Sequence, residues 1–564
     1  MHLKEPGLSL VFNGEIYNFR ELRAILESRG HNNWTGKSDS EVILHSYEEW
    51  GLEGLTKLEG IFSIALWDAK LRRLILMRDR LGVKPLFYGD SRNGLAFGSE
   101  IKAVLAAGGI DTSFDDQSIS EYMWYGNTYG NRTFYRGVHS LEPGHWLIVE
   151  NGQQKIESWW NLEDWFDHPL EVTGKRDASE LLRSALDQAV SRQLVSDVPL
   201  GIFLSGGVDS SSIAASAVSQ TNEALHSYAA GFDFSNGVDE LPKASRVARH
   251  LGLDHHELQI KGTDIEDVLV ILAKAHDEPF ADAANIPLYL MCRKLSGQIK
   301  VVLQGDGGDE LFAGYRRYAA LRNTNLWKLW PKFFSVALRK CGKHGKRIAR
   351  IADSVGNSDP AMCMAFLLTM EMAEDPPDKF FQVERQKELF SIADPFLQYR
   401  LAAQRFQKYD PVQKMLLTDL TVQLPSQFLT KVDRATMAAG IEARVPLLDE
   451  KVVRLAVNIP SIWKVQGVQK KIILRDSQRT RLPDAILDGP KTGFGVPYER
   501  WMRSSLNDFV KSLILDKEFL DKFSLNGKLI EEEFGKNSCL RSGFQLWKIF
   551  QLSLFHFYSY KPSV

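Results

Sequence analysis

The residues best suited to phosphate chemistry are the run Ser205-Gly206-Gly207-Val208-Asp209-Ser210, which follows an apolar stretch and precedes a helical pattern. Two glycines let the backbone approach a polyanion, and the free amides at a helix N-terminus point toward it. Ser205 and Ser210 add hydroxyl donors. Asp209 would repel a phosphate unless a divalent cation lay between them. The loop therefore predicts a site for Mg²⁺ and pyrophosphate.

A second glycine-rich and acidic loop is Gln304-Gly305-Asp306-Gly307-Gly308-Asp309-Glu310, which follows another apolar run. In an open parallel sheet, ligands bind at the carboxyl ends of the strands. If both runs are strands of one such sheet, the two loops face one site. Asp209 and Asp309 are then candidate ligands of the same metal ion.

The elements around these loops alternate between strand and helix patterns. Apolar runs predict strands at 199–204, 226–232, 256–260 and 300–304. Helical spacing is found between and before them, at 178–194, 210–220, 239–251, 265–275 and 286–295. Such alternation predicts a parallel sheet covered on both faces. From about residue 315 the pattern is mostly helical.

The first 160 residues read differently, as short strands and helices in quick succession. A strand at 8–12 is predicted to stop at Asn13-Gly14, a turn signal, before a helix at 19–28. Further strands are predicted at 61–67, 74–77, 86–88, 95–97, 145–150 and 155–159. A polar segment spotted with aromatic residues then predicts a linker between two domains.

Composition places the chain among ordinary globular proteins. Its 564 residues predict two to four domains of about 150 residues each. Lys and Arg number 69 against 71 Asp and Glu, so the basic excess of a nucleic-acid binder is missing. No apolar run approaches the roughly 18 residues of a membrane span. The four cysteines have no CxxC spacing. We expect a cytoplasmic enzyme that binds neither nucleic acid nor membrane.

Several longer motifs carry a family resemblance. In the second part these are SGGVDS at 205–210, GDGGDELFAGY at 305–315, KVDRATMAAGIEARVPLLD at 431–449 and KTGFGVP at 491–497. In the first part they are VFNGEIYNFREL at 11–22, SDSEVIL at 38–44 and RDRLGVKPLFY at 78–88. In this order, the motifs resemble the glutamine-hydrolysing asparagine synthetases, over nearly the whole chain.

The resemblance implies an α/β fold with two activities. An Ntn-type αββα glutaminase domain, here truncated, would occupy 1–160, with a linker at 161–177. A PP-loop synthetase domain, related to the adenine nucleotide alpha hydrolases, would occupy 178–564, with a parallel sheet and a helical C-terminal part. Such an enzyme uses ATP and Mg²⁺ to convert aspartate to aspartyl-AMP, which ammonia from glutamine turns into asparagine. The family also implies an internal ammonia tunnel and a homodimer.

Residue roles in the glutaminase part follow from the matching motifs. Asn13 and Gly14 match the pair that donates to the developing oxyanion, where each donor is typically worth about 3 kcal/mol. Glu15 and Asp39 match acids that hold the α-amino group of glutamine.

Residue roles in the synthetase part follow in the same way. Asp306 matches an acid needed for the aspartyl-AMP step, and Lys491 matches a lysine that neutralises charge on the phosphates. Nucleotide-binding positions are matched by the loop residues of the first motif and by Leu204, Ala230, Gln304 and Gly305.

The chain departs from the family at its start. Family members begin with Met-Cys-Gly and use that cysteine as the nucleophile, whereas this chain begins Met1-His2-Leu3 and has its first cysteine at Cys292. In family members, the arginine that binds the glutamine carboxylate lies upstream of the NGEIYN motif, in a segment that this chain does not contain. Either the N-terminus is truncated, which we favour, or the protein uses free ammonia or another amine. In both cases we expect no glutamine hydrolysis.

Three other interpretations remain. A family member could act on another carboxylate, as an amide or lactam former or a sugar-acid amidotransferase. An RNA-modifying PP-loop adenylase also carries SGGxDS, and the basic residues at 339–350 would be its RNA patch, although a solvated helix face explains them better. A catalytically silent binding protein would not need Asp209, Asp309 and Lys491 together.

His255-His256 is interpreted as structural, because no further metal-ligand spacing accompanies it.

Overall fold

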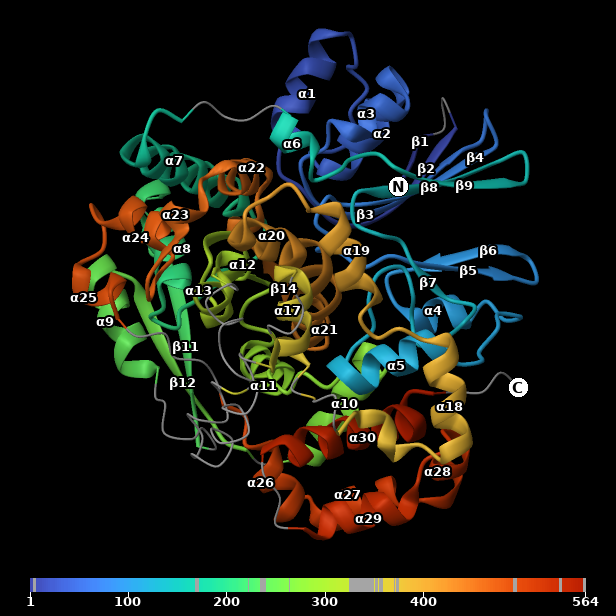
Figure 1. Ribbon diagram of the computed structural model, residues 1–564. Helices are drawn as coiled ribbons and strands as arrows, with labels where there is room; N and C mark the ends of the chain where they lie inside the picture. The colour runs from blue at the N-terminus through green and yellow to red at the C-terminus, as the bar shows by residue number, and fades with distance from the viewer. Residues whose placement is uncertain are drawn as a thin grey trace.

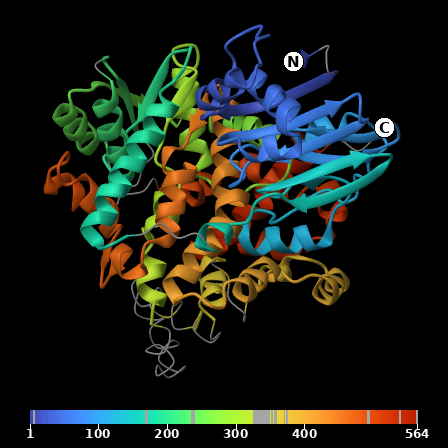
Figure 2. The same ribbon diagram turned by 90° about the horizontal axis from the view of Figure 1, so that it is seen from above.

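The computed structural model describes the chain except for residues 4–6, 168–171, 222, 234–239, 263, 324–348, 350–352, 355–358, 370, 372–374, 490–494, 537–539 and 561–564. Figures 1 and 2 show the N-terminal sheets on one side of the molecule and the sheet that carries β11 and β12 on the other, with helices between them. No helix among the described residues is long and apolar enough to cross a membrane.

The first domain is built on a six-stranded antiparallel sheet in the order β1-β2-β3-β4-β8-β9. Its strands are β1 (His2–Leu3), β2 (Leu8–Ile16), β3 (Gly60–Asp68), β4 (Arg73–Arg78), β8 (His145–Glu150) and β9 (Gln153–Ser158). Alternate apolar residues of β2, β3 and β4 pack against α1 (Phe19–Ser28), α2 (Asp39–Trp50) and α3 (Leu52–Thr56).

The opposite face of this sheet meets a second, three-stranded sheet. Its order is β6-β5-β7, from β5 (Phe87–Ser91), β6 (Gly94–Gly98) and β7 (His139–Ser140). A small hydrophobic cluster that includes Ala65, Leu76, Tyr88 and Leu147 fills the space between the sheets. With α4 (Ile101–Leu105) and α5 (Asp116–Tyr125) beyond them, the layers run helix, sheet, sheet, helix.

The predicted turn at Asn13-Gly14 is wrong. Strand β2 continues through both residues to Ile16, with Gly14 opposite Phe62 of β3. Gly14 has φ of +138°, and a Cβ on it would lie 1.9 Å from the carbonyl oxygen of Ile61. Glycine is therefore required here by a close backbone approach inside the sheet, and not by a reversal of the chain.

The hydrophobic cores do not follow the division of the sequence into two blocks. Residues of α4, α5 and the segment after them share one hydrophobic cluster with the C-terminal helix α30 (Leu540–Tyr558). The hydroxyl of Tyr122 in α5 donates to the carbonyl of Lys548 in α30 at 2.6 Å. The segment predicted as a linker contains the short helix α6 (Asp164–Asp167) and the buried side chains of Leu162 and Trp165.

The second domain is built on a parallel sheet of five strands in the order β12-β11-β10-β13-β14. These are β10 (Leu200–Phe203), β11 (His226–Phe232), β12 (Asp254–Ile260), β13 (Val301–Leu303) and β14 (Glu442–Arg444). The four predicted strands are confirmed. Strand β14 was not predicted, because its Glu-Ala-Arg sequence has no apolar run.

Helices cover both faces of this sheet, as predicted. Ile202 and Leu303 pack in one hydrophobic cluster with α7 (Lys175–Gln193), α8 (Val208–Gln220) and α9 (Leu241–Leu251). Phe203 and Val302, one residue away in each strand, pack in another with α10 (Ile265–His276) and α11 (Asn285–Leu295). This alternation is what a sheet buried on both sides requires.

The remainder is mostly helical, as expected. Its elements in chain order are α12 (Gly308–Phe312), α13 (Arg316–Leu321), α17 (Pro360–Leu368), η1 (Pro377–Phe380), α18 (Val383–Ile392), α19 (Leu397–Arg405), α20 (Pro411–Thr418), η2 (Asp419–Phe428), α21 (Leu429–Met437), η3 (Pro446–Leu448), α22 (Glu450–Asn458), α23 (Ser461–Lys464), β15 (Val465–Gln466), β16 (Gln469–Lys470), α24 (Ile472–Gln478), α25 (Asp484–Leu487), α26 (Tyr498–Arg503), α27 (Asn507–Ile514), α28 (Lys517–Lys522) and α29 (Gly527–Gly535).

Candidate functional site

The two glycine-rich loops leave the same edge of the parallel sheet and touch each other. Strand β10 leads into the 205–207 loop and α8, and the neighbouring β13 leads into the 304–307 loop and α12. A Cβ on Gly305 would lie 2.9 Å from Cβ of Asp209, and one on Gly308 would lie 2.6 Å from Cγ of Asp209. The glycines therefore allow the second loop to pack directly on the acid of the first.

Asp209 and Asp309 converge on one buried ammonium, that of Lys471. Its Nζ lies 2.6 Å from Oδ1 of Asp309 and also forms an ion pair with Oδ2 of Asp209. Burial opposes the charge on this lysine, but the two carboxylates outweigh that effect and raise its pKa. Two carboxylates held on one cation form an arrangement that a divalent ion could also occupy.

Asp306 lies beside this trio. Burial raises the pKa of its carboxyl; the Lys431 ammonium opposes the rise, and the carboxylates of Asp209 and Asp309 add to it. Lys431 itself is held by Asp282, with 3.1 Å between Nζ and Oδ2. An acid held in this way is a candidate proton acceptor.

A cavity of about 240 Å³ opens beside the first loop. It is lined by 205–209 and by basic side chains from three other segments, namely Lys243, Arg246, Lys470, Lys471 and Arg475. Such a lining suits a polyphosphate.

The sequence analysis missed all five of these basic residues. The available signal was the Lys470-Lys471 pair directly before an apolar helix, which by itself reads as an ordinary surface pattern.

The other nucleotide-binding candidates lie near the same edge. Leu204 directly follows β10, Ala230 lies within the neighbouring β11, and both are buried. The amide of Leu204 donates to the carbonyl of Tyr228 at 2.9 Å. The side chains of Leu204 and Ala230 belong to hydrophobic clusters on opposite faces of the sheet. Gln304 is also buried. Lys491 lies outside the described residues, as do the six basic residues counted between 339 and 350.

The structure brings the four glutaminase candidates together. Asn13, Gly14 and Glu15 are consecutive on β2, and Nδ2 of Asn13 donates to Oγ of Ser99 at 3.1 Å. Asp39, at the start of α2, accepts the amide of Ile16 through Oδ2 at 2.9 Å. One hydrogen bond thus joins the end of β2 to the start of α2.

Glu15 links this region to the second domain. Its Oε1 lies 2.8 Å from a guanidinium nitrogen of Arg444 on β14. Burial raises the pKa of Glu15 to about 7, against the opposing pull of Arg444. The carbonyl of Arg444 in turn accepts the amide of Gln304 at 3.0 Å. A single residue therefore contacts both candidate sites, which sequence reasoning did not foresee.

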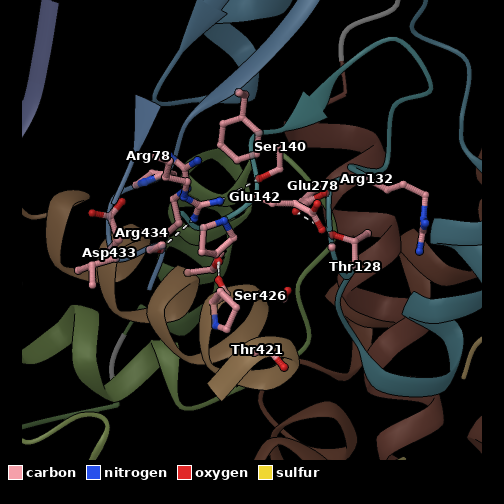
Figure 3. Close-up of a pocket in the computed structure, with 18 of the residues that line it drawn as sticks. Arg78, Thr128, Arg132, Ser140, Glu142, Glu278, Thr421, Ser426, Asp433 and Arg434 are labelled. Atoms are coloured by element: carbon pink, nitrogen blue, oxygen red, sulfur yellow. Dashed lines mark hydrogen bonds between the residues drawn. The ribbon is translucent and has the colours of Figure 1, made fainter. Parts of the chain in front are cut away.

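Two cavities lie between the domains. One, of about 70 Å³, is lined by charged groups that include Arg78, Asp433 and Arg434 (Figure 3). Nη2 of Arg434 donates to the carbonyl of Ser99 at 3.0 Å, so this cavity adjoins the region of Asn13. The other, of about 20 Å³, is lined from the first domain by Tyr17, Ile61 and Val83 and from the second by Val445 and Leu448.

Residues 1–160 contain no cysteine. Among the described residues, the cysteines are Cys292 and Cys363, and both are buried in the second domain. Burial raises the pKa of the Cys292 thiol to about 12, so it remains protonated at neutral pH. No described side chain supplies a thiolate to Asn13 and Gly14.

Family comparisons cover most of the chain. A sequence model of the family described as asparagine synthase matches residues 181–556, and one described as a glutamine amidotransferase domain matches residues 1–160. The second match begins at residue 1. The expected loss of N-terminal strands is therefore not supported.

Relatives span the same two parts. A putative asparagine synthetase (glutamine-hydrolyzing) of Mycobacterium tuberculosis H37Rv is 31% identical, over 88% of this chain and 76% of its own. Asparagine synthetase (glutamine-hydrolyzing) 1 of Bacillus subtilis is 29% identical, over 90% and 79%. Amidase chry2 of Gibberella zeae is 24% identical, over 91% and 80%. A solved phosphoribosylpyrophosphate amidotransferase of B. subtilis matches with a TM-score of only 0.21, over 53% of this chain and 55% of that one.

Proposed function

Because this chain belongs to the asparagine synthase family, we propose that it is an ATP-dependent ligase that converts aspartate to asparagine through aspartyl-AMP. The observation that carries the proposal is the convergence of Asp209 and Asp309 on Lys471, at the edge of a cavity lined by basic side chains. That is the arrangement needed to hold a polyphosphate with its cation.

The proposed reaction has two steps. An oxygen of the aspartate side-chain carboxylate attacks the α-phosphorus of ATP, and the bond to pyrophosphate breaks. Ammonia then attacks the acyl carbon, and the C–O bond to AMP breaks with loss of a proton from nitrogen. Asp306, with its raised pKa, is suited to accept that proton.

The residues around the loops would divide the remaining tasks. Asp209 and Asp309 fit a Mg²⁺ ion, because a cation already fits between their carboxylates in this structure. The bound ion would neutralise charge on the phosphates. Lys471 and Lys491 are proposed to do the same, and Leu204, Ala230, Gln304 and Gly305 to line the nucleotide site.

The source of ammonia is the second part of the proposal. Asn13, Gly14, Glu15 and Asp39 would bind glutamine and its oxyanion. The cavity of about 20 Å³ between the domains would lie on the path of ammonia. Since residues 1–160 hold no cysteine, we infer that these residues by themselves do not hydrolyse glutamine.

The test is the formation of AMP and asparagine from aspartate, ATP and Mg²⁺, with ammonium and with glutamine in parallel. We expect product with ammonium and none with glutamine. Asp209→Asn and Asp306→Asn should each abolish most of the activity. Asp197→Asn, an exposed acid in the same domain, is the matched control and should keep it. Glutamate release from glutamine would contradict the second part of the proposal and leave the first intact.

A second candidate is amide formation on another carboxylate. It is favoured by the Gibberella relative named an amidase, which matches 91% of this chain. The adenylation loops are common to both reactions and do not separate them. Exchange of labelled pyrophosphate into ATP, measured with a panel of acids in place of aspartate, decides between the two.

A further inference from the structure

The amino ends of β11 and β12 bring together three side chains that can bind a metal. The parallel register places His226 opposite Asp254 and Tyr228 opposite His256. Successive side chains of a strand point to opposite faces, so Asp254 and His256, two residues apart, lie on the same face. His226 lies on that face as well, because residues paired across neighbouring strands point to the same side of the sheet. Three potential ligands from two strands therefore lie on one face, at the amino ends of the edge strand β12 and its neighbour β11.

The distances between the three ligand atoms form a compact triangle. Nδ1 of His226 lies 2.9 Å from Oδ2 of Asp254 and 3.2 Å from Nε2 of His256. The third side, from Nε2 of His256 to Oδ2 of Asp254, is 3.4 Å. With bonds of about 2.0–2.1 Å, the ligands of a tetrahedral Zn²⁺ lie about 3.3 Å apart. The triangle therefore matches one face of such a tetrahedron.

The scaffold holds these side chains before any ion binds. The two strands pair over seven successive positions. The ring of His256 stacks on that of Tyr228 with 5.1 Å between centroids and 21° between planes. The adjacent His255 points away, and its Nδ1 lies 2.9 Å from Oγ of Ser227. His226, Asp254 and His256 are each about half exposed, so an ion can enter from solvent and keep water as its fourth ligand.

We propose that His226, Asp254 and His256 form a site for a divalent transition metal, with Zn²⁺ as the best fit. Two imidazoles and one carboxylate suit such an ion better than they suit Mg²⁺. The site lies at the amino ends of the strands, whereas the glycine-rich loops leave the carboxyl ends. A strand of seven residues separates these edges by about 20 Å. The ion is therefore not the cation of the ATP site, and it would clamp the edge strand β12 to β11.

One other cluster among the described residues has comparable spacing: His31, His45 and Glu48. Nδ1 of His45 lies 3.2 Å from Nδ1 of His31 and 3.0 Å from Oε2 of Glu48. A metal on Nδ1 of His45 would place a proton on its buried Nε2, for which the described residues offer no acceptor, and such a group is costly to bury. The rim site has no such penalty.

The test is a zinc titration of the full chain, first stripped with a chelator, in competition with a chromophoric zinc indicator. We expect one tightly bound Zn²⁺ per chain. Loss of an outer-shell partner typically weakens a site by about 10- to 100-fold, so loss of a direct ligand in His226→Gln or His256→Gln should weaken binding by about 100-fold or more. His255→Gln is the matched control and should bind as the wild type does.

Two further readouts make the result decisive. Co²⁺ in place of Zn²⁺ should give the intense visible absorption of a tetrahedral site, and His226→Gln should remove it. Zn²⁺ should raise the melting temperature of the wild type and not that of His256→Gln. The proposal is overturned if the wild type binds no zinc, if neither rim variant changes the affinity, or if His45→Gln abolishes binding instead.

Discussion

Removal of the Lys471 ammonium should make the fold of the second domain dependent on a divalent cation. In Lys471→Met, the side chain keeps its length and loses its charge. The carboxylates of Asp209 and Asp309 then lose the ammonium that joins them. We expect a large loss of stability without Mg²⁺ and partial recovery with it.

The size of the effect follows from the geometry. At 2.6 Å and an effective dielectric constant near 20, the attraction between Lys471 and Asp309 is about 6 kcal/mol before desolvation is subtracted. Breaking a buried ion pair by removing one partner typically costs about 3–5 kcal/mol. The side chains of Asp209 and Asp309 retain 21% and 16% exposure, so water screens part of the repulsion. We therefore expect a loss of about 3 kcal/mol.

Mg²⁺ should return part of that loss. A ligand present at about ten times its dissociation constant stabilises the state that binds it by about 1.4 kcal/mol. The wild type should gain less, because there the ion must displace the lysine.

The assay is urea unfolding monitored by tryptophan fluorescence, for wild type and variant, with and without millimolar Mg²⁺. Lys451→Met is the matched control: its ammonium is exposed and donates to the side-chain Oε1 of Gln188 at 3.3 Å. That variant should unfold as the wild type does in both conditions. An unchanged urea midpoint for Lys471→Met without Mg²⁺ would refute the electrostatic reasoning.

Three further predictions concern closely packed or buried groups. Gly14→Ala should cost several kcal/mol or prevent folding, because its Cβ would meet a carbonyl oxygen at 1.9 Å, whereas Gly174→Ala, which meets nothing within 4 Å, should melt like wild type. Burial lowers the pKa of His276 to about 3, so the folded state holds it neutral while the unfolded state binds a proton below pH 6.5. Stability should therefore fall as the pH falls from 6.5 toward 3, by up to about 1.4 kcal/mol per unit, and His276→Gln should flatten that slope in acid titrations. Arg444→Met should remove the guanidinium that pairs with both Glu15 and Glu442. In urea unfolding it should cost less than the about 3–5 kcal/mol of a fully buried pair, because the Glu15 side chain is 37% exposed, and Glu15→Gln should restore part of the loss.

The two glycine-rich loops were predictable because their signals are local. The glycines and Asp209, with a strand pattern before them and a helix pattern after them, were sufficient to predict a loop between β10 and α8. That both loops leave one edge also followed from the alternation of strands and helices, since parallel strands end together. The pairing of β10 with β13 confirms this placement.

The error at Asn13-Gly14 has a physical reason. The dipeptide is a strong turn signal when judged against its neighbours along the chain. In the fold, the same positive φ of Gly14 serves a close approach to β3, which lies more than 40 residues later. The sequence shows a glycine at position 14, but it does not show that the backbone of β3, at Ile61, is what excludes a larger residue there.

By itself, the sequence determined the elements whose causes lie within a dozen residues: the helices, the four apolar strands of the parallel sheet and the two acidic loops. Tertiary structure alone decided which distant groups meet. It placed Lys471 between Asp209 and Asp309, and β14 beside β13. The strand register likewise brought His226 to His256. Such contacts depend on pairing between segments far apart in the chain. The residues next to a lysine or histidine in the sequence do not indicate which distant side chain it will contact.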